Sequence, residues 1–237
     1  MMDQGLDHLV YATPDLDASV EELANRLGTD PVPGGAHPGW GTRNALIGLG
    51  TGVYLEIIGP DSRQPEPDRS RPFLIDELTE ARLVTWAYRH PDPESMRDTL
   101  ELALRNTTGD HGVRLGPVRK MSRTRPDGAT LHWRLSDPMA LPAGGVVPFV
   151  IDWGATPHPS AALPNECRLL ELVVSHPDPV TIRLVLEPLR PAPKVIQPLR
   201  DEANGEVSMV ADISIVAAME PGIRARIRTP NGEIDLS

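Results

Sequence analysis

A segment of about eleven residues recurs three times along the chain, and this internal repeat limits the folds open to it. Its first copy is LDHLVYATPDL at residues 6–16. Degenerate copies are LVTWAYRHPDP at residues 83–93 and LLELVVSHPDP at residues 169–179. Corresponding positions of a repeat occupy equivalent places in successive structural units, so residues far apart in the chain can be compared position by position.

Each copy predicts a strand, a turn and a helix. Apolar or alternating residues precede the turn, and roughly a dozen residues with helical periodicity follow it. We expect Thr13, His90 and His176 to cap the helices, with proline at the first helical position and aspartate in the first turn. The buried helix stripes are then Leu16, Val20, Leu23 and Leu27, followed by Met96, Leu100 and Leu104, and by Ile182, Leu186 and Leu189.

Further strands are predicted after each helix, so that every unit is βαβββ or close to it. In the first unit a loop rich in Gly and Pro separates the helix from a hairpin turned at Gly50-Thr51-Gly52. The fold class is therefore α+β, with repeated βαβββ modules that form curled mixed sheets around a cleft. The predicted strands cover residues 44–49 and 53–58, then 119–125, 131–135 and 148–153, then 195–199, 208–217 and 223–228.

The modules are expected at residues 1–60, 83–154 and 167–237, packed as one globular unit, with the second one degenerate. Linkers at residues 61–82 and 155–166, both rich in proline near their starts, join them. We expect two modules to enclose the cleft and the remaining one to extend or close it. Because three is an odd number, either one unit is degenerate or a second chain completes the assembly, so a homodimer is an open expectation.

Composition narrows the class of partner. The 237 residues are 40% apolar with ordinary charge density, which argues against disorder, and one cysteine excludes an internal disulfide framework. A net charge of -10 disfavours nucleic-acid binding, which needs concentrated Lys and Arg. No apolar run reaches membrane-spanning length, and no leader is evident. We expect a cytoplasmic protein with a small-molecule partner, no nucleic acid and no membrane.

The order of several sequence stretches resembles the glyoxalase-like branch of the vicinal oxygen chelate superfamily. The stretches are LDHLVYATPDLD, GGAHPGWGTRNALIGLG and VYLEIIGP, continued by MSRTRPDGATLHWRL, VPFVIDWG and the last HPDP. The resemblance implies the glyoxalase/bleomycin resistance/dioxygenase fold, in which a His on the first strand and a Glu on the last strand of a module commonly bind a divalent metal. Members range from isomerases, epimerases and dioxygenases to metal-free drug-binding proteins, so the resemblance does not select a reaction.

Carried over to this chain, the resemblance places His8 and Glu56 at the two ligand positions of the first module. Thr85 and Ile151 occupy these positions in the second module, whose last strand would offer an inward face of Phe149, Ile151 and Trp153 for packing or substrate binding. Glu171 and Arg226 occupy them in the third module.

A metal site follows if the cleft draws on the first and third modules. His8, Glu56 and Glu171 then form a His-carboxylate-carboxylate set suited to Mn, Fe, Zn or Mg, with Arg226 nearby. In the competing interpretation Arg226 replaces the metal by pairing with Glu171 or Glu56, which leaves a charged, metal-free pocket.

The remaining candidate residues are predicted to contact substrate. His37 lies in a glycine-rich loop, where it serves as a general base or substrate contact or merely orders the loop. Arg123 either meets an anionic substrate or is solvated on a hairpin. The full set of predicted substrate contacts is His37, Thr42, Asn44, Arg123, Trp133, Trp153 and Arg226, with Glu56 and His37 as catalytic candidates.

Three functions remain open. The first is a metal-dependent lyase, isomerase or oxygenase that chelates vicinal oxygens of a small molecule. The second is a metal-free enzyme in which His8 and Glu56 act as acid and base. The third is a non-catalytic protein that sequesters a small molecule, as resistance members of the superfamily do, with tryptophan side chains as the binding walls.

Overall fold

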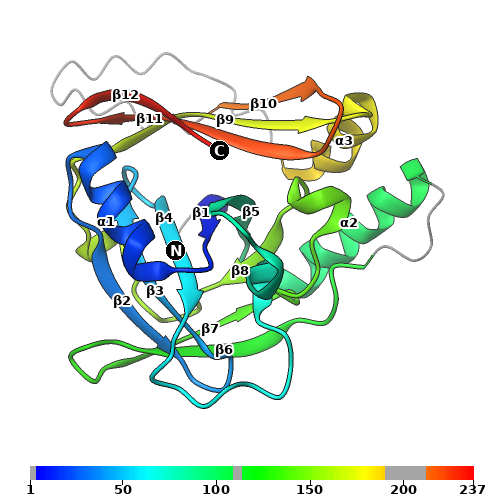
Figure 1. The fold of residues 1–237 in the computed structure, drawn as a ribbon. Helices are drawn as coiled ribbons and strands as arrows, with labels where there is room; N and C mark the ends of the chain where they lie inside the picture. Colours follow the sequence, from blue (N-terminus) through cyan, green and yellow to red (C-terminus); the bar gives the residue numbers. More distant parts are fainter. Residues whose placement is uncertain (1–3, 109–113, 190–211) are drawn as a thin grey trace, which may run out of the picture.

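Eight strands from the first two repeats close into a barrel, and a four-stranded sheet from the third repeat lies against its outside (Figure 1). The computed structural model describes residues 4–108, 114–189 and 212–237. Two of the three predicted modules therefore enclose the interior, and the curled α+β architecture that the sequence predicts is confirmed.

The barrel strands follow the order β1-β4-β3-β2-β6-β7-β8-β5. In the first repeat β1 pairs with β4 in parallel, and in the second β5 pairs with β8 in parallel, so the two halves have the same wiring. The two halves are joined by antiparallel pairing of β1 with β5 and of β2 with β6. The strand bounds are β1 Gly5–Ala12, β2 Val32–His37, β3 Thr42–Gly48, β4 Tyr54–Pro60, β5 Arg82–Arg89, β6 Arg119–Thr124, β7 Thr130–Leu135 and β8 Phe149–Asp152.

Strand β2 corrects the sequence prediction, which placed its residues in a loop. Its Gly and Pro content disfavours a strand, but tertiary pairing with β3 and β6 overrides that preference. Gly35 is needed for the approach to β6, because it has a φ of 137° and a side chain there would lie 2.0 Å from the carbonyl oxygen of Thr124.

Three α-helices follow the repeated turns, as predicted: α1 Leu16–Leu27, α2 Pro93–Thr108 and α3 Pro179–Leu186. The predicted caps were wrong by two residues. The carboxylates of Asp15, Asp92 and Asp178 accept the hydrogen bonds from the first-turn amides. Thr13, His90 and His176 instead accept a hydrogen bond from the backbone amide of the aspartate two residues later, which fixes the turn before each helix.

Short 3-10 helices interrupt the connections at η1 Pro72–Glu77, η2 Pro142–Gly145, η3 Pro159–Ala162 and η4 Glu187–Leu189.

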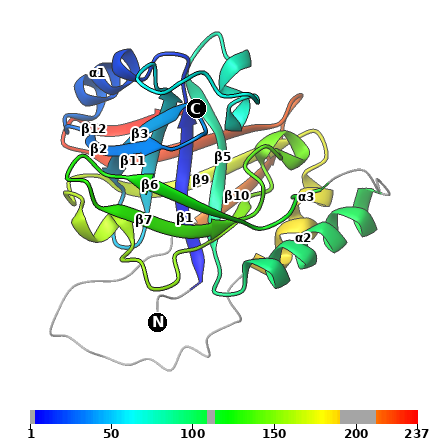
Figure 2. The same cartoon turned by 90° about the horizontal axis from the view of Figure 1, so that it is seen from below.

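Among the described residues, no helix is both long enough and apolar enough to cross a membrane. Helices α2 and α3 contact one another at one side of the molecule (Figure 2).

The outer sheet has the strand order β10-β9-β11-β12. Here β9 pairs in parallel with β10 and antiparallel with β11. The first strand of the other two repeats pairs in parallel with the last strand of its module, so the third repeat is wired differently from them. The bounds are β9 Arg168–His176, β10 Asp212–Ala217, β11 Gly222–Thr229 and β12 Gly232–Leu236. The predicted strand at 195–199 lies outside the described residues.

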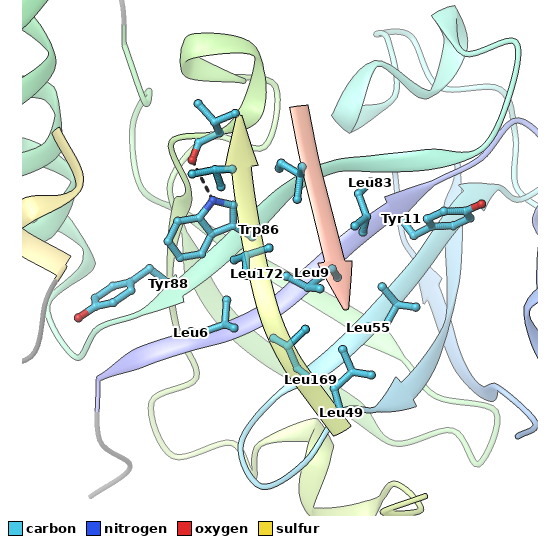
Figure 3. Packing of buried hydrophobic residues seen from close by; sticks show 14 of the residues in the cluster. Leu6, Leu9, Tyr11, Leu49, Leu55, Leu83, Trp86, Tyr88, Leu169 and Leu172 are labelled. Carbon is cyan, nitrogen blue, oxygen red and sulfur yellow. Dashed lines mark hydrogen bonds between the residues drawn. The ribbon is translucent and has the colours of Figure 1, made fainter. Parts of the chain in front are cut away.

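A continuous apolar core joins this sheet to the barrel (Figure 3). Leu169 and Leu172 of β9 pack with Leu6 and Leu9 of β1 and with Trp86 of β5, all buried. The outer sheet therefore covers the outward side chains of β1 and β5, while their inward side chains face the barrel interior.

Candidate functional site

The barrel interior contains a cavity of about 510 Å³, with the open solvent at its mouth included. Its polar side chains come mainly from the first repeat, and its aromatic and aliphatic wall comes mainly from the second. Phe149, Ile151 and Trp153, the predicted inward face of the second module, all line this cavity. The cavity is lined by His8, His37, Trp40, Thr42, Asn44, Tyr54, Glu56, Ile58, Pro72, Phe73, Met121, Arg123, Trp133, Leu135, Pro138, Phe149, Ile151 and Trp153.

Glu56 lies between two histidines in this cavity. Its Oε2 atom is 3.7 Å from Nε2 of His8, and its Oε1 atom is 4.0 Å from Nε2 of His37. The amide of Asn44 donates a hydrogen bond of 2.5 Å to Oε1. All four side chains are buried. The structure thus places a carboxylate, fixed by one hydrogen bond, within reach of two imidazole rings.

A β-bulge in β1 orients His8. The pairing of β1 with β5 shifts register between Leu6 and His8, which inserts Asp7 as an extra residue. Strict alternation would put Asp7 and His8 on opposite faces. With the bulge, Nδ1 of His8 lies 2.6 Å from Oδ1 of Asp7. The His8 ring also stacks on Tyr54, with ring centroids 4.6 Å apart, so both its position and its tilt are set.

Asp7 is the centre of a fully buried polar network. Its carboxylate also accepts hydrogen bonds from the indole of Trp153 at 3.2 Å, from Nη1 of Arg89 at 3.0 Å and from Nε2 of His158 at 3.1 Å. Burial alone would raise the pKa of Asp7, but the hydrogen bonds from His158 and His8 outweigh burial and hold that pKa well below its usual range. Asp7 is therefore an anion, and His8 must donate from Nδ1 to it.

His37 sits at the end of β2, where its Nδ1 atom lies 3.0 Å from the hydroxyl oxygen of Thr42. Burial lowers the pKa of His37 to about 4, and the nearby charge of Glu56 opposes this shift only in part. At neutral pH the ring is uncharged, so one ring nitrogen carries a lone pair that can accept a proton.

Arg123 reaches into the same cavity from β6. Its Nη1 atom donates a hydrogen bond of 3.2 Å to Oδ1 of Asn44, so Asn44 connects Arg123 to Glu56. Gly34 makes this contact possible, because a side chain there would lie 2.1 Å from Oδ1 of Asn44 and 2.7 Å from Nη1 of Arg123. The prediction that Arg123 lies on a solvated hairpin face is therefore wrong, since only 5% of the residue is exposed.

Aromatic rings form the opposite wall. Trp133 and Trp153 lie 5.2 Å apart between ring centroids, and Trp133 meets the edge of His37 at 6.2 Å. Phe149 contacts the edge of His8 at 5.4 Å. The polar side chains thus face an apolar surface, which is the usual composition of a small-molecule site.

The structure does not bring Glu171 and Arg226 to this cavity. Glu171 lies on β9 of the outer sheet, where it accepts a hydrogen bond of 2.7 Å from the hydroxyl of Ser214 on β10. Arg226 is partly exposed and lies 3.3 Å from Asp235. The carry-over of ligand positions to the third repeat fails because that repeat is wired differently and stays outside the barrel.

Several side chains at the site were missed by sequence reasoning. The position of Asp7 next to His8 was a usable signal, because histidines at functional sites often bond to a carboxylate through their second ring nitrogen. His158 carried no such signal. It lies in a loop 150 residues after His8, and only the folded chain brings it to Asp7.

The donor set does not fit a tightly held divalent metal. Within the described ranges, no group of three or more His, Cys, Asp or Glu side chains is placed to hold an ion. His8 and Glu56 supply two donors, whereas the second repeat supplies Thr85, which bonds to the carbonyl of Gly145, and Ile151. Metal sites of proteins generally use three or more protein donors, so the residues present fall short of one.

Comparisons with known proteins agree with this architecture. The family model described as a glyoxalase-like domain matches residues 6–189. A hypothetical protein from Staphylococcus aureus has the same fold over 99% of both chains, at 13% identity and a TM-score of 0.62.

Two weaker structural similarities are to methylmalonyl-CoA epimerases. The enzyme from Mycobacterium tuberculosis is 21% identical over 62% of this chain and 87% of its own, with a TM-score of 0.36. The Streptomyces coelicolor enzyme, in complex with 2-nitronate-propionyl-CoA, is 19% identical over 65% of this chain and 98% of its own, with a TM-score of 0.39. Among curated proteins, no match was found.

Proposed function

The chain belongs to the glyoxalase-like domain family of the vicinal oxygen chelate superfamily, and we propose that it is an enzyme that moves a proton on a small molecule bound inside the barrel. The observation that carries this proposal is the position of Glu56 between His8 and His37. A buried carboxylate within reach of two imidazoles is a common arrangement for acid-base catalysis.

The geometry around His8 leaves a gap that a proton donor can fill. Because Nδ1 of His8 donates to the Asp7 anion, a neutral His8 would present a lone pair at Nε2 to Glu56, which is itself an acceptor. At 3.7 Å the two atoms are too far apart for a direct hydrogen bond, so a donor group of a bound substrate fits between them. The proposed mechanism uses this arrangement with the proton on Nε2 of His8 and with Glu56 as the carboxylate.

The chemical step that fits these groups is proton abstraction next to a carbonyl. Glu56 accepts the proton from carbon, and the C–H electron pair moves to the carbonyl oxygen to give an enolate. Protonated His8 donates from Nε2 to that oxygen while Nδ1 stays bonded to Asp7. Return of a proton to carbon or to a neighbouring atom gives an epimerised or isomerised product.

The metal-dependent reaction implied by the sequence resemblance is less well supported. Its third predicted ligand, Glu171, is in the outer sheet, and Asn44 already donates to one oxygen of Glu56. Arg123 also places a positive charge near Glu56, with only the side chain of Asn44 between them, and this charge disfavours binding of a metal cation at Glu56. The acid-base interpretation requires only the groups that line the cavity.

Proton exchange with solvent tests the proposal directly. Pyruvate, 2-oxobutyrate and phenylpyruvate carry protons on the carbon next to a carbonyl, and their exchange in D₂O is followed by proton NMR. We expect exchange catalysed by the wild-type protein and a decrease of about 100-fold or more in Glu56→Gln. Glu233→Gln, which changes an exposed carboxylate of β12 paired with Arg228, is the matched control.

Exchange that persists in Glu56→Gln contradicts the proposed role of Glu56. Binding of these compounds without any catalysed exchange would favour the sequestering function instead, since the cavity would then hold the ligand without reaction.

A further inference from the structure

Arg123 is a buried cation that contacts no carboxylate among the described residues. With these residues its guanidinium makes one hydrogen bond, from Nη1 to Asn44, and its buried Nε atom makes none. Within the described part of the chain, no Asp or Glu oxygen lies within 4.0 Å of it. A buried N–H without a partner is destabilising, so such a group needs an explanation.

The other buried charges near the cavity are already balanced. The Asp7 anion is bonded to Arg89, at 3.0 Å, as well as to two histidines. Glu56 has His8 within 3.7 Å. Arg123 approaches Glu56 only through the amide of Asn44. The cavity thus contains one positive charge that a ligand with one negative charge would neutralise.

The shape and charge of a guanidinium favour a carboxylate. Its planar fork of N–H donors matches the two oxygens of a carboxylate, and burial strengthens such a bond. A phosphate dianion would bring a second negative charge toward Glu56, and Arg123 is the one Arg or Lys among the described residues that line the cavity. Burial lowers the pKa of Arg123, as expected for a cation that has lost its solvent, but guanidinium groups stay protonated at neutral pH.

The rest of the cavity selects the body of the ligand. Trp133, Trp153 and Phe149 form an apolar wall across from the polar residues. Planar groups stack or meet edge-on with such rings.

We propose that the substrate class is a monocarboxylate with an apolar, planar body, its carboxylate bound by Arg123 and its body held against Trp133 and Trp153. This inference rests on the proposed function, because it assigns the substrate of the same site. It goes beyond that proposal by stating which charge and shape the site selects.

Calorimetric titration with two probes tests the inference. Benzoate and benzamide have the same size and planarity, but only benzoate carries a negative charge. We expect the wild-type protein to bind benzoate at least tenfold more tightly than benzamide, and Arg123→Gln to abolish this preference. Arg119→Gln is the matched control, because Arg119 lies on the same strand but is exposed and paired with Asp137. It should bind benzoate as the wild type does.

Equal binding of the two probes by the wild-type protein overturns the inference, and this result does not depend on whether any variant folds. Unchanged benzoate binding in a folded Arg123→Gln or Arg123→Met protein overturns it as well. Tighter binding of phenylphosphonate dianion than of benzoate would contradict the assignment of a single negative charge.

The inference and the proposed function fail in different ways. Benzoate binding is an equilibrium measurement that needs no proton transfer, so it is measured independently of proton exchange. Catalysed exchange without a preference for benzoate supports the proposed function and contradicts the proposal that Arg123 binds a substrate carboxylate. A preference for benzoate without catalysed exchange does the reverse.

Discussion

Asp7 and His8 are neighbours in the sequence whose side chains also contact each other, with 2.6 Å between Oδ1 and Nδ1. Adjacent strand residues normally point to opposite faces, and the bulge in β1 removes that alternation here. As a result, Asp7 lies behind His8 and leaves Nε2 of the ring toward Glu56. The acid-base pair thus depends on a residue that does not line the cavity.

We therefore expect Asp7→Asn to impair both stability and turnover. Asparagine cannot accept hydrogen bonds from His8, His158 and Arg89 as a carboxylate does, and the half-buried guanidinium of Arg89 no longer faces a negative charge at this position. The free energy of unfolding should fall by about 3–5 kcal/mol, the usual effect of breaking a buried ion pair.

Denaturant unfolding measures the loss in Asp7→Asn, with Asp127→Asn as a control at an exposed turn. If the protein with asparagine at position 7 unfolds at the wild-type denaturant concentration, the network around Asp7 contributes little. Exchange should also slow in this variant, since asparagine holds Nδ1 of His8 less strongly than the carboxylate does.

His37 should make stability depend on pH in the mildly acidic range. Its pKa is about 4 in the folded protein and near 6.5 in the unfolded chain, so between these values the unfolded state binds more protons. Stability contributed by neutral His37 is then complete above pH 6.5 and declines as pH falls toward 4, by up to ~1.4 kcal/mol per pH unit. Urea unfolding between pH 4 and 7 measures the slope.

The variant His37→Gln is the control for this slope, because glutamine does not titrate. Its stability curve should be flatter than that of the wild type over the same pH range. Equal slopes for the two proteins would show that His37 is protonated in the folded state, contrary to the direction of its pKa.

Gly34→Ala should disturb Glu56 from a distance. The added methyl group would lie 2.1 Å from Oδ1 of Asn44, so Asn44 must move and release the carboxylate of Glu56. We expect a loss of about 1–3 kcal/mol in stability from overpacking, together with slower proton exchange. The same substitution in an Asn44→Ala background should have a smaller effect, because the nearest atom that the methyl group meets is gone and Nη1 of Arg123, at 2.7 Å, remains. Equal effects in both backgrounds would contradict this coupling.

Local sequence patterns predicted those parts of the fold that depend on residues near each other. The helical period of 3.6 residues predicted the buried stripe that contains Leu23 and Leu27. The strand period of 2 predicted the inward face of Phe149, Ile151 and Trp153. The ligand positions His8 and Glu56 followed from the family resemblance, and the structure places them in one cavity.

The closure of the barrel could not be predicted from the sequence. Closure of the barrel depends on strand pairing between repeats, such as that of Ala36 in β2 with Thr124 in β6. The third repeat has a similar strand-turn-helix sequence pattern, but its strands do not join the barrel. The same limit applies to His158 and to the burial of Arg123, which the sequence offered as a substrate contact with a solvated hairpin face as the alternative. Each is unremarkable on its own strand or loop, and each reaches the site only through contacts with residues many positions away.

Metal content distinguishes the two catalytic interpretations. Because the described residues offer His8 and Glu56 but no third donor for one ion, we expect exchange activity to survive dialysis against a chelator and to gain nothing from added Mn, Fe, Zn or Mg. Elemental analysis before and after dialysis shows whether the metal was removed. Glu171→Gln should change neither metal content nor exchange, and should lower stability only by about 1 kcal/mol through its bond to Ser214. Activity that disappears with the metal and returns with it would mean that a substrate or water completes a site on His8 and Glu56, and the acid-base proposal would then have to be replaced.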